Sequence, residues 1–366
     1  MLETTNMKQP PPPLLLSLVL PEELIIEILL KLPVRSLLRF ICVCKSWKTL
    51  IDSPQFVKDH LRNSMSDTNM TRQQLVSFAK NESNKIETCS VQSLFENPSA
   101  PPEILSFRVE SKHQYIVGSC YGLMCLCDHN GYFRLWNPST RLASVRSPRI
   151  NIVKLFTRYG FGYDQVNDKY KVLYTRGFET RVHTFGTNCW TTIHTSPRAR
   201  PEWSDEEEGK FVSGTLNWLA PKRDCIISFD LENETYDEVL LPLQLHDDSP
   251  RNHVLDALSN CLCLSYSNNI HCAVWLMKKY GIQESWTKLI SIPRWKLQIP
   301  KRPRCVRLSF HLRPLCISEN VVVLVRSNDG HVVMFNTNNG KLKFPKIKGR
   351  ISHDMHIYHE CLVSPL

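Results

Sequence analysis

The sequence predicts an α+β chain of more than one domain, with a small helical module at the front and a mainly-β domain behind it. Two changes of pattern support this prediction. Apolar residues recur at helical spacing over residues 17–62, whereas from about residue 101 they alternate as they do in strands. Between these regions, residues 63–100 are rich in Ser, Asn, Thr, Gln and Lys, which predicts a polar linker with at most one strand.

The composition is that of an ordinary globular protein. The 366 residues are 42% hydrophobic and 22% charged, which is enough to bury a sizeable core. A wholly disordered chain, a coiled coil and a collagen-like fibre are therefore excluded. The formal charge of +10 raises a nucleic acid or an acidic protein as a partner.

The N-terminal residues do not match a targeting signal. Residues 1–16 contain four consecutive prolines and are expected to form a Pro-rich disordered tail. The apolar run 14–20 is short and lacks the basic start and cleavage site of a signal peptide. No stretch approaches the roughly 20 apolar residues that span a bilayer, so we expect no membrane partner. The fourteen cysteines are then most simply reduced thiols of a protein in the cytoplasm and/or nucleus.

Residues 17–62 predict short helices separated by prolines. Pro21 suits a first helical turn, where Glu22 and Glu23 are favourable. Pro33 ends this helix and can open the next, and 52–54 (Asp-Ser-Pro) predicts the start of a short fourth helix. The apolar faces of the first three comprise Leu24, Ile28 and Leu32, then Val34, Leu37, Leu38 and Ile41, then Val43, Trp47, Leu50 and Ile51. Three short helices cannot bury all of these among themselves, so they face either a partner or the rest of this chain.

The string from Leu20 to Trp47 resembles an F-box of the kind found in plant F-box proteins. It includes Leu-Pro at 20–21, Glu-Ile-Leu at 27–29, Leu-Pro-Val at 32–34 and Cys-Val-Cys at 42–44. The resemblance implies a three-helix F-box over 17–62 that binds a Skp-type adaptor and, through it, a cullin scaffold. The implied adaptor-binding residues are Leu20, Pro21, Leu24, Ile28, Leu32, Pro33 and Leu37. Val43, Trp47 and Leu50 are expected to hold the helices together, with Trp47 as a core residue.

A repeated β unit follows. Asn-Gly at 130–131, between two apolar runs, is a strong hairpin signal. Each unit is a hairpin followed by a strand that ends in an aromatic residue, Asn or Asp, and a polar turn. The landmarks Trp136, Trp190, Phe229, Trp275 and Phe335 are 54, 39, 46 and 60 residues apart. This spacing brackets the roughly 40–50 residues of a four-stranded propeller blade, so we predict a β-propeller, with a sandwich as the alternative.

Five segments of this region resemble the F-box-associated, kelch-like region of plant F-box proteins. They are 118–123, 136–140, 160–164, 168–172 and 214–218. Together with the front module the resemblance covers most of the chain, although it thins after about residue 290. It implies that residues 101–366 form a kelch-like β-propeller that recruits a protein substrate for ubiquitination, and it leaves the number of blades and the substrate open.

The sequence carries no catalytic motif that we recognise. G-x-S-x-G, H-E-x-x-H and Gly-rich phosphate loops are missing. Neither the Cys-x-Cys-x-His at 125–129 nor the histidines at 353, 356 and 359 match a zinc-ligand spacing, so we expect no metal and no cofactor. The cysteines at 305, 316 and 361 have no visible histidine partner. This absence is consistent with the non-catalytic subunit of a ubiquitin ligase that the resemblance implies.

Two other functions are carried as alternatives. A β-propeller enzyme acting on glycans, with the helical front as an internal cap, needs paired carboxylates facing the channel. The candidates Asp164, Asp168, Asp230 and Glu234 fall at turns instead. A nucleic-acid binder would use the basic runs at 294–307 and 341–350, which oppose the acidic run 205–208. We expect these runs to be solvated loops, although 301–304 also resembles a nuclear-import sequence, and a nucleic-acid partner is not favoured.

Overall fold

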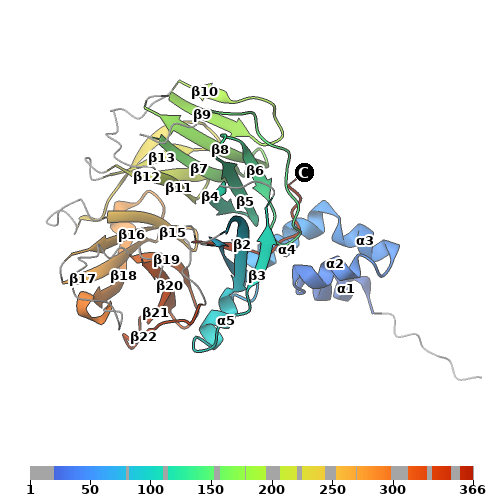
Figure 1. The fold of residues 1–366 in the computed structure, drawn as a ribbon, viewed down its shortest axis with the longest axis horizontal. Coiled ribbons are helices and arrows are strands. Elements are labelled where there is room, and N and C mark those ends of the chain that lie inside the picture. The colour runs from blue at the N-terminus through green and yellow to red at the C-terminus, as the bar shows by residue number, and fades with distance from the viewer. Residues whose placement is uncertain are drawn as a thin grey trace, which may run out of the picture.

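The computed structural model describes residues 20–79, 82–109, 114–151, 157–177, 179–194, 207–220, 225–243, 253–268, 270–297, 312–327, 332–347 and 355–365. Figure 1 shows a group of helices on one side of a larger, mainly-β domain. The helices are α1 (Glu22–Leu30), α2 (Val34–Phe40), α3 (Lys45–Ile51) and α4 (Pro54–Met65). The Pro-rich tail expected at 1–16 lies outside the described residues. No helix in the described ranges is long and apolar enough to cross a membrane.

The helix boundaries follow the predicted prolines and caps. Pro21 precedes α1, whose first turn holds two glutamates, and Pro33 precedes α2. The Ser53 hydroxyl accepts a hydrogen bond from the Phe56 backbone N–H at 3.3 Å, and Pro54 is the first residue of α4. Since a proline at this position gives up only an N–H that has no helical partner, it fixes the start of a helix at little cost. The fourth helix is therefore confirmed, and with 12 residues it is the longest of the four.

The four helices share one small core. Leu29, Leu37, Ile51 and Phe56 are buried together. The rings of Phe40 and Trp47 meet edge to face beside them, with centroids 5.3 Å apart. Leu362, close to the C-terminus, packs against the same cluster. The helical module is therefore completed by a residue from the other end of the chain.

The strands form six antiparallel units in the described part of the chain, which we call blades 1 to 6. Blade 1 consists of β23 (Met355–His359), β1 (Gln73–Ala79), β2 (Glu82–Ser90) and β3 (Leu105–Arg108), and blade 2 of β4 (Gln114–Cys120), β5 (Leu123–Asp128) and β6 (Phe133–Trp136). Blade 3 consists of β7 (Thr157–Asp164), β8 (Lys169–Arg176), β9 (Glu179–Thr184) and β10 (Thr191–Ile193), and blade 4 of β11 (Glu207–Val212), β12 (Thr215–Ala220), β13 (Cys225–Asp230) and β14 (Tyr236–Leu240). Blade 5 consists of β15 (His253–Leu258), β16 (Cys261–Ser267), β17 (His271–Met277) and β18 (Trp286–Pro293), and blade 6 of β19 (Leu312–Ile317), β20 (Val322–Ser327), β21 (Val332–Asn336) and β22 (Leu342–Lys343). Blades 3 and 4 are joined by parallel pairing of β7 with β11.

The blades form a closed ring. Their first strands, β23, β4, β7, β11, β15 and β19, contact one another in that order around a central channel. A separate apolar cluster fills each of the six interfaces between neighbouring blades. This arrangement is that of a β-propeller, which confirms the predicted architecture and excludes the sandwich.

Blade 1 closes the ring with strands from both ends of the β domain. The C-terminal strand β23 pairs antiparallel with β1, and Gln73 lies opposite His359 while Ser77 lies opposite Met355. The prediction of a polar linker with at most one strand at 63–100 is therefore wrong. This segment contains β1, β2 and the helix α5 (Val91–Glu96). The strands could not be predicted from the local sequence because β23, which pairs with β1, lies about 280 residues further along the chain.

The aromatic landmarks fall where the repeat predicts them in four of the five cases. Trp136, Phe229, Trp275 and Phe335 lie on the third strands of blades 2, 4, 5 and 6, whereas Trp190 lies between β9 and β10. The Asn or Asp that follows three of them accepts backbone N–H groups of the next turn, as the Asn137, Asp230 and Asn336 side chains do. The repeated residue therefore closes a turn in blades 2, 4 and 6.

Candidate functional site

The helical module leaves an apolar row in solvent. Leu20, Leu24 and Ile28 are 53%, 45% and 50% exposed, and Leu24 and Ile28 lie one turn apart on α1. Leu38 on α2 is also exposed. Isolated apolar residues on a surface are ordinary, but a contiguous row on a small module is typical of a docking surface.

The structure divides the predicted adaptor-binding residues into three groups. Leu20, Pro21, Leu24, Ile28 and Pro33 are exposed, and Leu32 is half-buried. Leu37 is fully buried in the helical core, so its assignment to the adaptor surface is wrong. Helix α2 has only seven residues, and the face that carries Leu37 turns inward while its neighbour Leu38 takes the solvent side.

The predicted core residues divide as well. Val43 is 62% exposed and does not hold the helices together, because it lies in the turn between α2 and α3 rather than on a helical face. Trp47 and Leu50, both on α3, pack against the buried cluster. The helical spacing of apolar residues in the sequence continues from Ile41 to Trp47, but the chain is not helical between the end of α2 at Phe40 and the start of α3 at Lys45.

Helix α4 and the residues after it attach the module to the propeller. Lys58 forms an ion pair with Asp168, the two charged atoms being 2.9 Å apart. The Arg72 guanidinium donates to the Leu30 carbonyl at 2.7 Å.

His60 is fully buried, and its Nε2 lies 2.9 Å from the Leu32 carbonyl. Burial lowers the pKa of His60, so the imidazole that bonds to this carbonyl is the neutral form.

These contacts define two faces of the propeller. The helix-side face carries the turns that follow β4 and β7 and the end of β23, at Gly122, Asp168 and Glu360. The opposite face is where the first strands of the blades begin. Blades 3 and 4 have the same orientation because β7 and β11 run parallel. Blade 5 shares this orientation, since Asn260, in the turn after β15, accepts from the N–H of Ser213 in the turn after β11.

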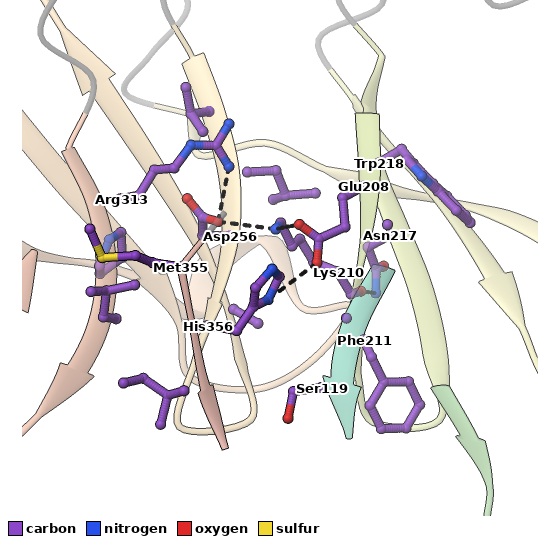
Figure 2. A pocket seen from close by; sticks show the side chains of 18 of the residues that line it. Ser119, Glu208, Lys210, Phe211, Asn217, Trp218, Asp256, Arg313, Met355 and His356 are labelled. Atoms are coloured by element: carbon purple, nitrogen blue, oxygen red, sulfur yellow. Dashed lines mark hydrogen bonds and ion pairs between the residues drawn. The ribbon is translucent and has the colours of Figure 1, made fainter. Parts of the chain in front are cut away.

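A cavity of about 620 Å³ lies in the central channel, lined by the first strands of all six blades. Figure 2 shows its charged side chains converging from several strands. Lys210 Nζ is 2.9 Å from Glu208 Oε2 and 3.4 Å from Asp256 Oδ1. Arg313 Nη1 is also 3.4 Å from Asp256 Oδ1, and His356 Nδ1 is 3.7 Å from Glu208 Oε1. The channel is therefore a charged and largely ion-paired space.

The channel carboxylates are poorly suited to acid catalysis. Burial raises the pKa of Glu208, but the cations Lys210, His356 and Arg313 outweigh it and hold this pKa below its usual value. A glycosidase needs one carboxylic acid whose pKa is raised, so that it stays protonated and can donate to the leaving group. Lys210 contacts both Glu208 and Asp256, so each of these carboxylates has a cation beside it.

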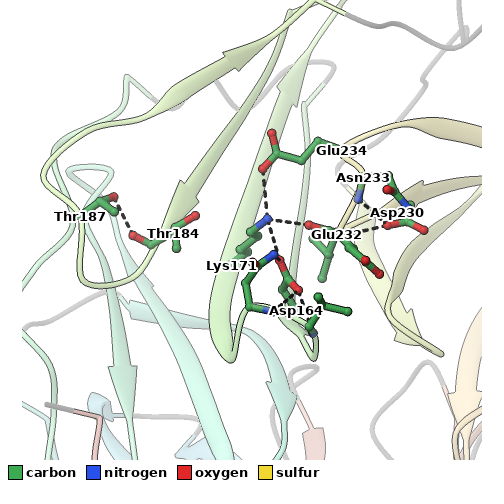
Figure 3. Close-up of polar contacts among 11 residues, drawn as sticks. Asp164, Lys171, Thr184, Thr187, Asp230, Glu232, Asn233 and Glu234 are labelled. Carbon is green, nitrogen blue, oxygen red and sulfur yellow. Dashed lines mark hydrogen bonds and ion pairs between the residues drawn. The ribbon is translucent and has the colours of Figure 1, made fainter.

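The acidic residues singled out in sequence lie on the helix-side face instead. Figure 3 shows Lys171 between Asp164 and Glu234, with Asp230 nearby in its own turn. Lys171 Nζ is 3.0 Å from Asp164 Oδ2 and 3.1 Å from Glu234 Oε1. Asp168 pairs with Lys58 of α4. Lys171 of blade 3 thus links Asp164 to Glu234 of blade 4, whereas Asp230 accepts N–H groups of its own turn. The four carboxylates therefore do not form the paired site that the glycan-processing alternative requires.

The histidine and cysteine candidates are separated in the fold. His356 contributes to the channel, whereas His359 is three residues on along β23, and residues 353 and 305 lie outside the described ranges. Cys316 and Cys361 are buried, and burial raises the pKa of both thiols, that of Cys361 to about 12. Such thiols are weak nucleophiles. Within the described residues, no three His, Cys, Asp or Glu side chains gather as a metal site.

Sequence reasoning did not place the channel charges together, and its expectation of a solvated loop at 205–208 is wrong at Glu208, which lies on β11. Glu208, Asp256, Arg313 and His356 come from four blades. The one local signal was the alternation of Glu208 and Lys210, which places both side chains on the same side of a strand.

Comparison with known proteins matches both parts of this chain. The model of the F-box domain matches residues 17–59, and that of the F-box associated beta propeller domain matches residues 68–364. The F-box/kelch-repeat protein At3g23880 of Arabidopsis thaliana is 29% identical over 94% of this chain and 96% of its own length. The F-box protein At4g22390 of the same plant is 26% identical over 86% of this chain and 82% of its own. The solved structure of U3-55K aligns with 72% of this chain and 75% of its own, at 9% identity and a TM-score of 0.37.

Proposed function

Because this chain belongs to the F-box proteins that carry an F-box associated β-propeller domain, we propose that it is the substrate-recognition subunit of a cullin-based ubiquitin ligase. Its helical module binds a Skp-type adaptor, and its propeller recruits a protein substrate. The observation that carries the proposal is the exposed row of Leu20, Leu24 and Ile28 on a module whose other leucines and isoleucines, apart from Leu38, are buried or half-buried.

The arrangement of the two domains supports this division of labour. The module is attached to the helix-side face through α4, so the described helices α1 to α4 do not cover the opposite face of the propeller. Loops and channel mouths on a rigid scaffold are common sites of recognition. Such a receptor needs no catalytic group, since holding the substrate near a charged conjugating enzyme raises its effective concentration. The proposed role is carried out in the cytoplasm and/or nucleus.

Adaptor binding is tested on the full chain by co-elution with a recombinant plant Skp-type adaptor. The double variant Leu24→Asp with Ile28→Asp places two charges on the exposed row, and we expect it to weaken binding at least tenfold without unfolding the module. The control is Val166→Asp, which places a charge on another exposed apolar residue (68% exposed) on the propeller. Equal affinity of the double variant and the control would remove the α1 face from the interface. Failure of the unaltered chain to bind any such adaptor would refute the proposed function itself.

A further inference from the structure

We propose that the central channel binds an anionic group that carries a hydrogen-bond donor beside it, such as the acidic segment of a recruited protein. The proposal rests on the proposed function for the identity of that protein, but the binding chemistry is independent of it. Three features of the channel support it: its balance of charge, one buried oxygen atom, and its position in the propeller.

The charge of the channel favours an anion. The cations Lys210, Arg313 and Arg326 line it against the carboxylates Glu208 and Asp256, an excess of one positive charge among the described lining residues. His253 and His356 also line the cavity and add to the excess when they are protonated. Opposite charges attract more strongly in a partly enclosed, low-dielectric space than in water, so an incoming carboxylate or phosphate is stabilised there.

One carboxylate oxygen of Asp256 can accept the hydrogen bond that the ligand's donor would make. Oδ1 of this carboxylate faces both Lys210 and Arg313, each at 3.4 Å. Oδ2 is buried and has no hydrogen-bond partner among the described residues, and the residue as a whole is only 7% exposed. A buried acceptor without a partner is destabilising. A ligand N–H or O–H next to the anionic group would satisfy it.

Two common chemical groups meet both requirements. Hydrogen phosphate has anionic oxygens and an O–H on the same atom. In a peptide, an Asp or Glu side chain supplies the anion and a neighbouring backbone N–H the donor. The cavity of about 620 Å³ has room for either, and apolar side chains such as Leu255 and Leu315 complete its wall.

The charged residues of the channel lie toward the face of the propeller opposite the helical module. Glu208, Arg313 and His356 are the second residues of their strands, and His253 and Asp256 are the first and fourth of β15. The charged ring therefore lies toward the face where the first strands begin, away from α4. A substrate can reach it while the helical module holds the adaptor.

The test uses the full chain bound to its adaptor. Inorganic phosphate is titrated against chloride at constant ionic strength, with the melting temperature as the readout, and a fluorescent Asp/Glu-rich peptide is titrated by anisotropy beside a Lys-rich peptide. We expect phosphate and the acidic peptide to bind, and Arg313→Gln to weaken both at least tenfold. Arg326→Gln is a second variant in case the first does not fold. Lys343→Gln, an exposed lysine on β22, removes the same charge outside the channel and is expected to change neither affinity.

The outcomes separate the ligand sources and the two proposals. Arg313-dependent binding of phosphate alone assigns the site to a small anion, and binding of both probes assigns it to an acidic protein segment. The channel proposal is overturned if neither probe binds, or if folded Arg313→Gln and Arg326→Gln bind as well as the unaltered chain. Co-elution of the same variants with the adaptor reports on the ligase role independently.

Discussion

Replacing Gly122 with alanine tests how the C-terminal segment is locked onto the propeller. Gly122 has a φ of +77°, in the left-handed region that costs a residue with a Cβ about 1–2 kcal/mol. A Cβ there would also lie 2.3 Å from the Cys361 sulfur and 2.7 Å from its Cβ, so Cys361 must move. Overpacking of this kind costs about 1–3 kcal/mol. The sum predicts that Gly122→Ala lowers the free energy of unfolding by about 2–5 kcal/mol.

Gly214→Ala separates the two contributions. Its φ of +82° is nearly the same, but no heavy atom lies within 4 Å of the added Cβ, so this control carries the backbone strain alone. We expect it to lose about 1–2 kcal/mol in urea unfolding followed by tryptophan fluorescence. If the two variants lose the same free energy to within about 0.5 kcal/mol, the contact of Gly122 with Cys361 contributes nothing and the reasoning is refuted.

Three further predictions concern buried polar groups and the core. Lys171→Met leaves a buried carboxylate unpaired and should cost about 3–5 kcal/mol in urea unfolding, whereas Lys31→Met breaks an exposed pair and should cost much less; equal losses would contradict this. The lowered pKa of His60 means that the neutral ring contributes stability above the unfolded pKa of about 6.5, which is lost as pH falls toward the folded pKa. The protection factors of the α4 amides, which are corrected for the slower intrinsic exchange at low pH, should therefore be smaller at pH 5.5 than at pH 7.5, and His60→Gln should abolish that difference. Trp218→Ala removes a ring that is 2% exposed and should cost about 3–5 kcal/mol, and Trp295→Ala, at 67% exposure, should leave the melting profile unchanged.

The protonation of His60 has a specific structural cost. Its Nε2 donates to the Leu32 carbonyl, while Nδ1 is buried without a hydrogen-bond partner among the described residues. A second proton would place an unsatisfied N–H and a charge there, beside Arg72, which also lowers this pKa. The effect should therefore appear at the junction between module and propeller before it appears in the blades.

The helical module could be predicted from the sequence because its signals are local. Prolines and a serine cap set the helix starts within a residue or two, whatever the rest of the chain does. The rotation of each short helix was harder to predict. Leu37 and Leu38 are adjacent and chemically identical, and only the packing of α2 on its neighbours decides which one is buried.

The propeller was predictable as a repeat but not as a closed ring. Blades 2 to 6 are continuous in sequence, so their hairpins and aromatic landmarks recur along the chain. Blade 1 combines β23 with β1, and the polar segment 82–90 gives no periodic signal of its own. The channel residues escaped prediction for the same reason, since Glu208 and His356 meet only once the ring has closed.

The closing strand also links the two domains. Directly after β23, Glu360 accepts hydrogen bonds from Gln74 of β1 and from the Val34 backbone of α2, and Leu362 packs on the helical core. Arg72, just before β1, reaches back to Leu30 of α1. Both ends of the β domain therefore meet the helical module at the seam of the ring. Opening that seam would release the contacts that hold the module, so the ring and the module should loosen together. An intact ring therefore holds the face opposite the helices at a fixed orientation to the exposed row of α1.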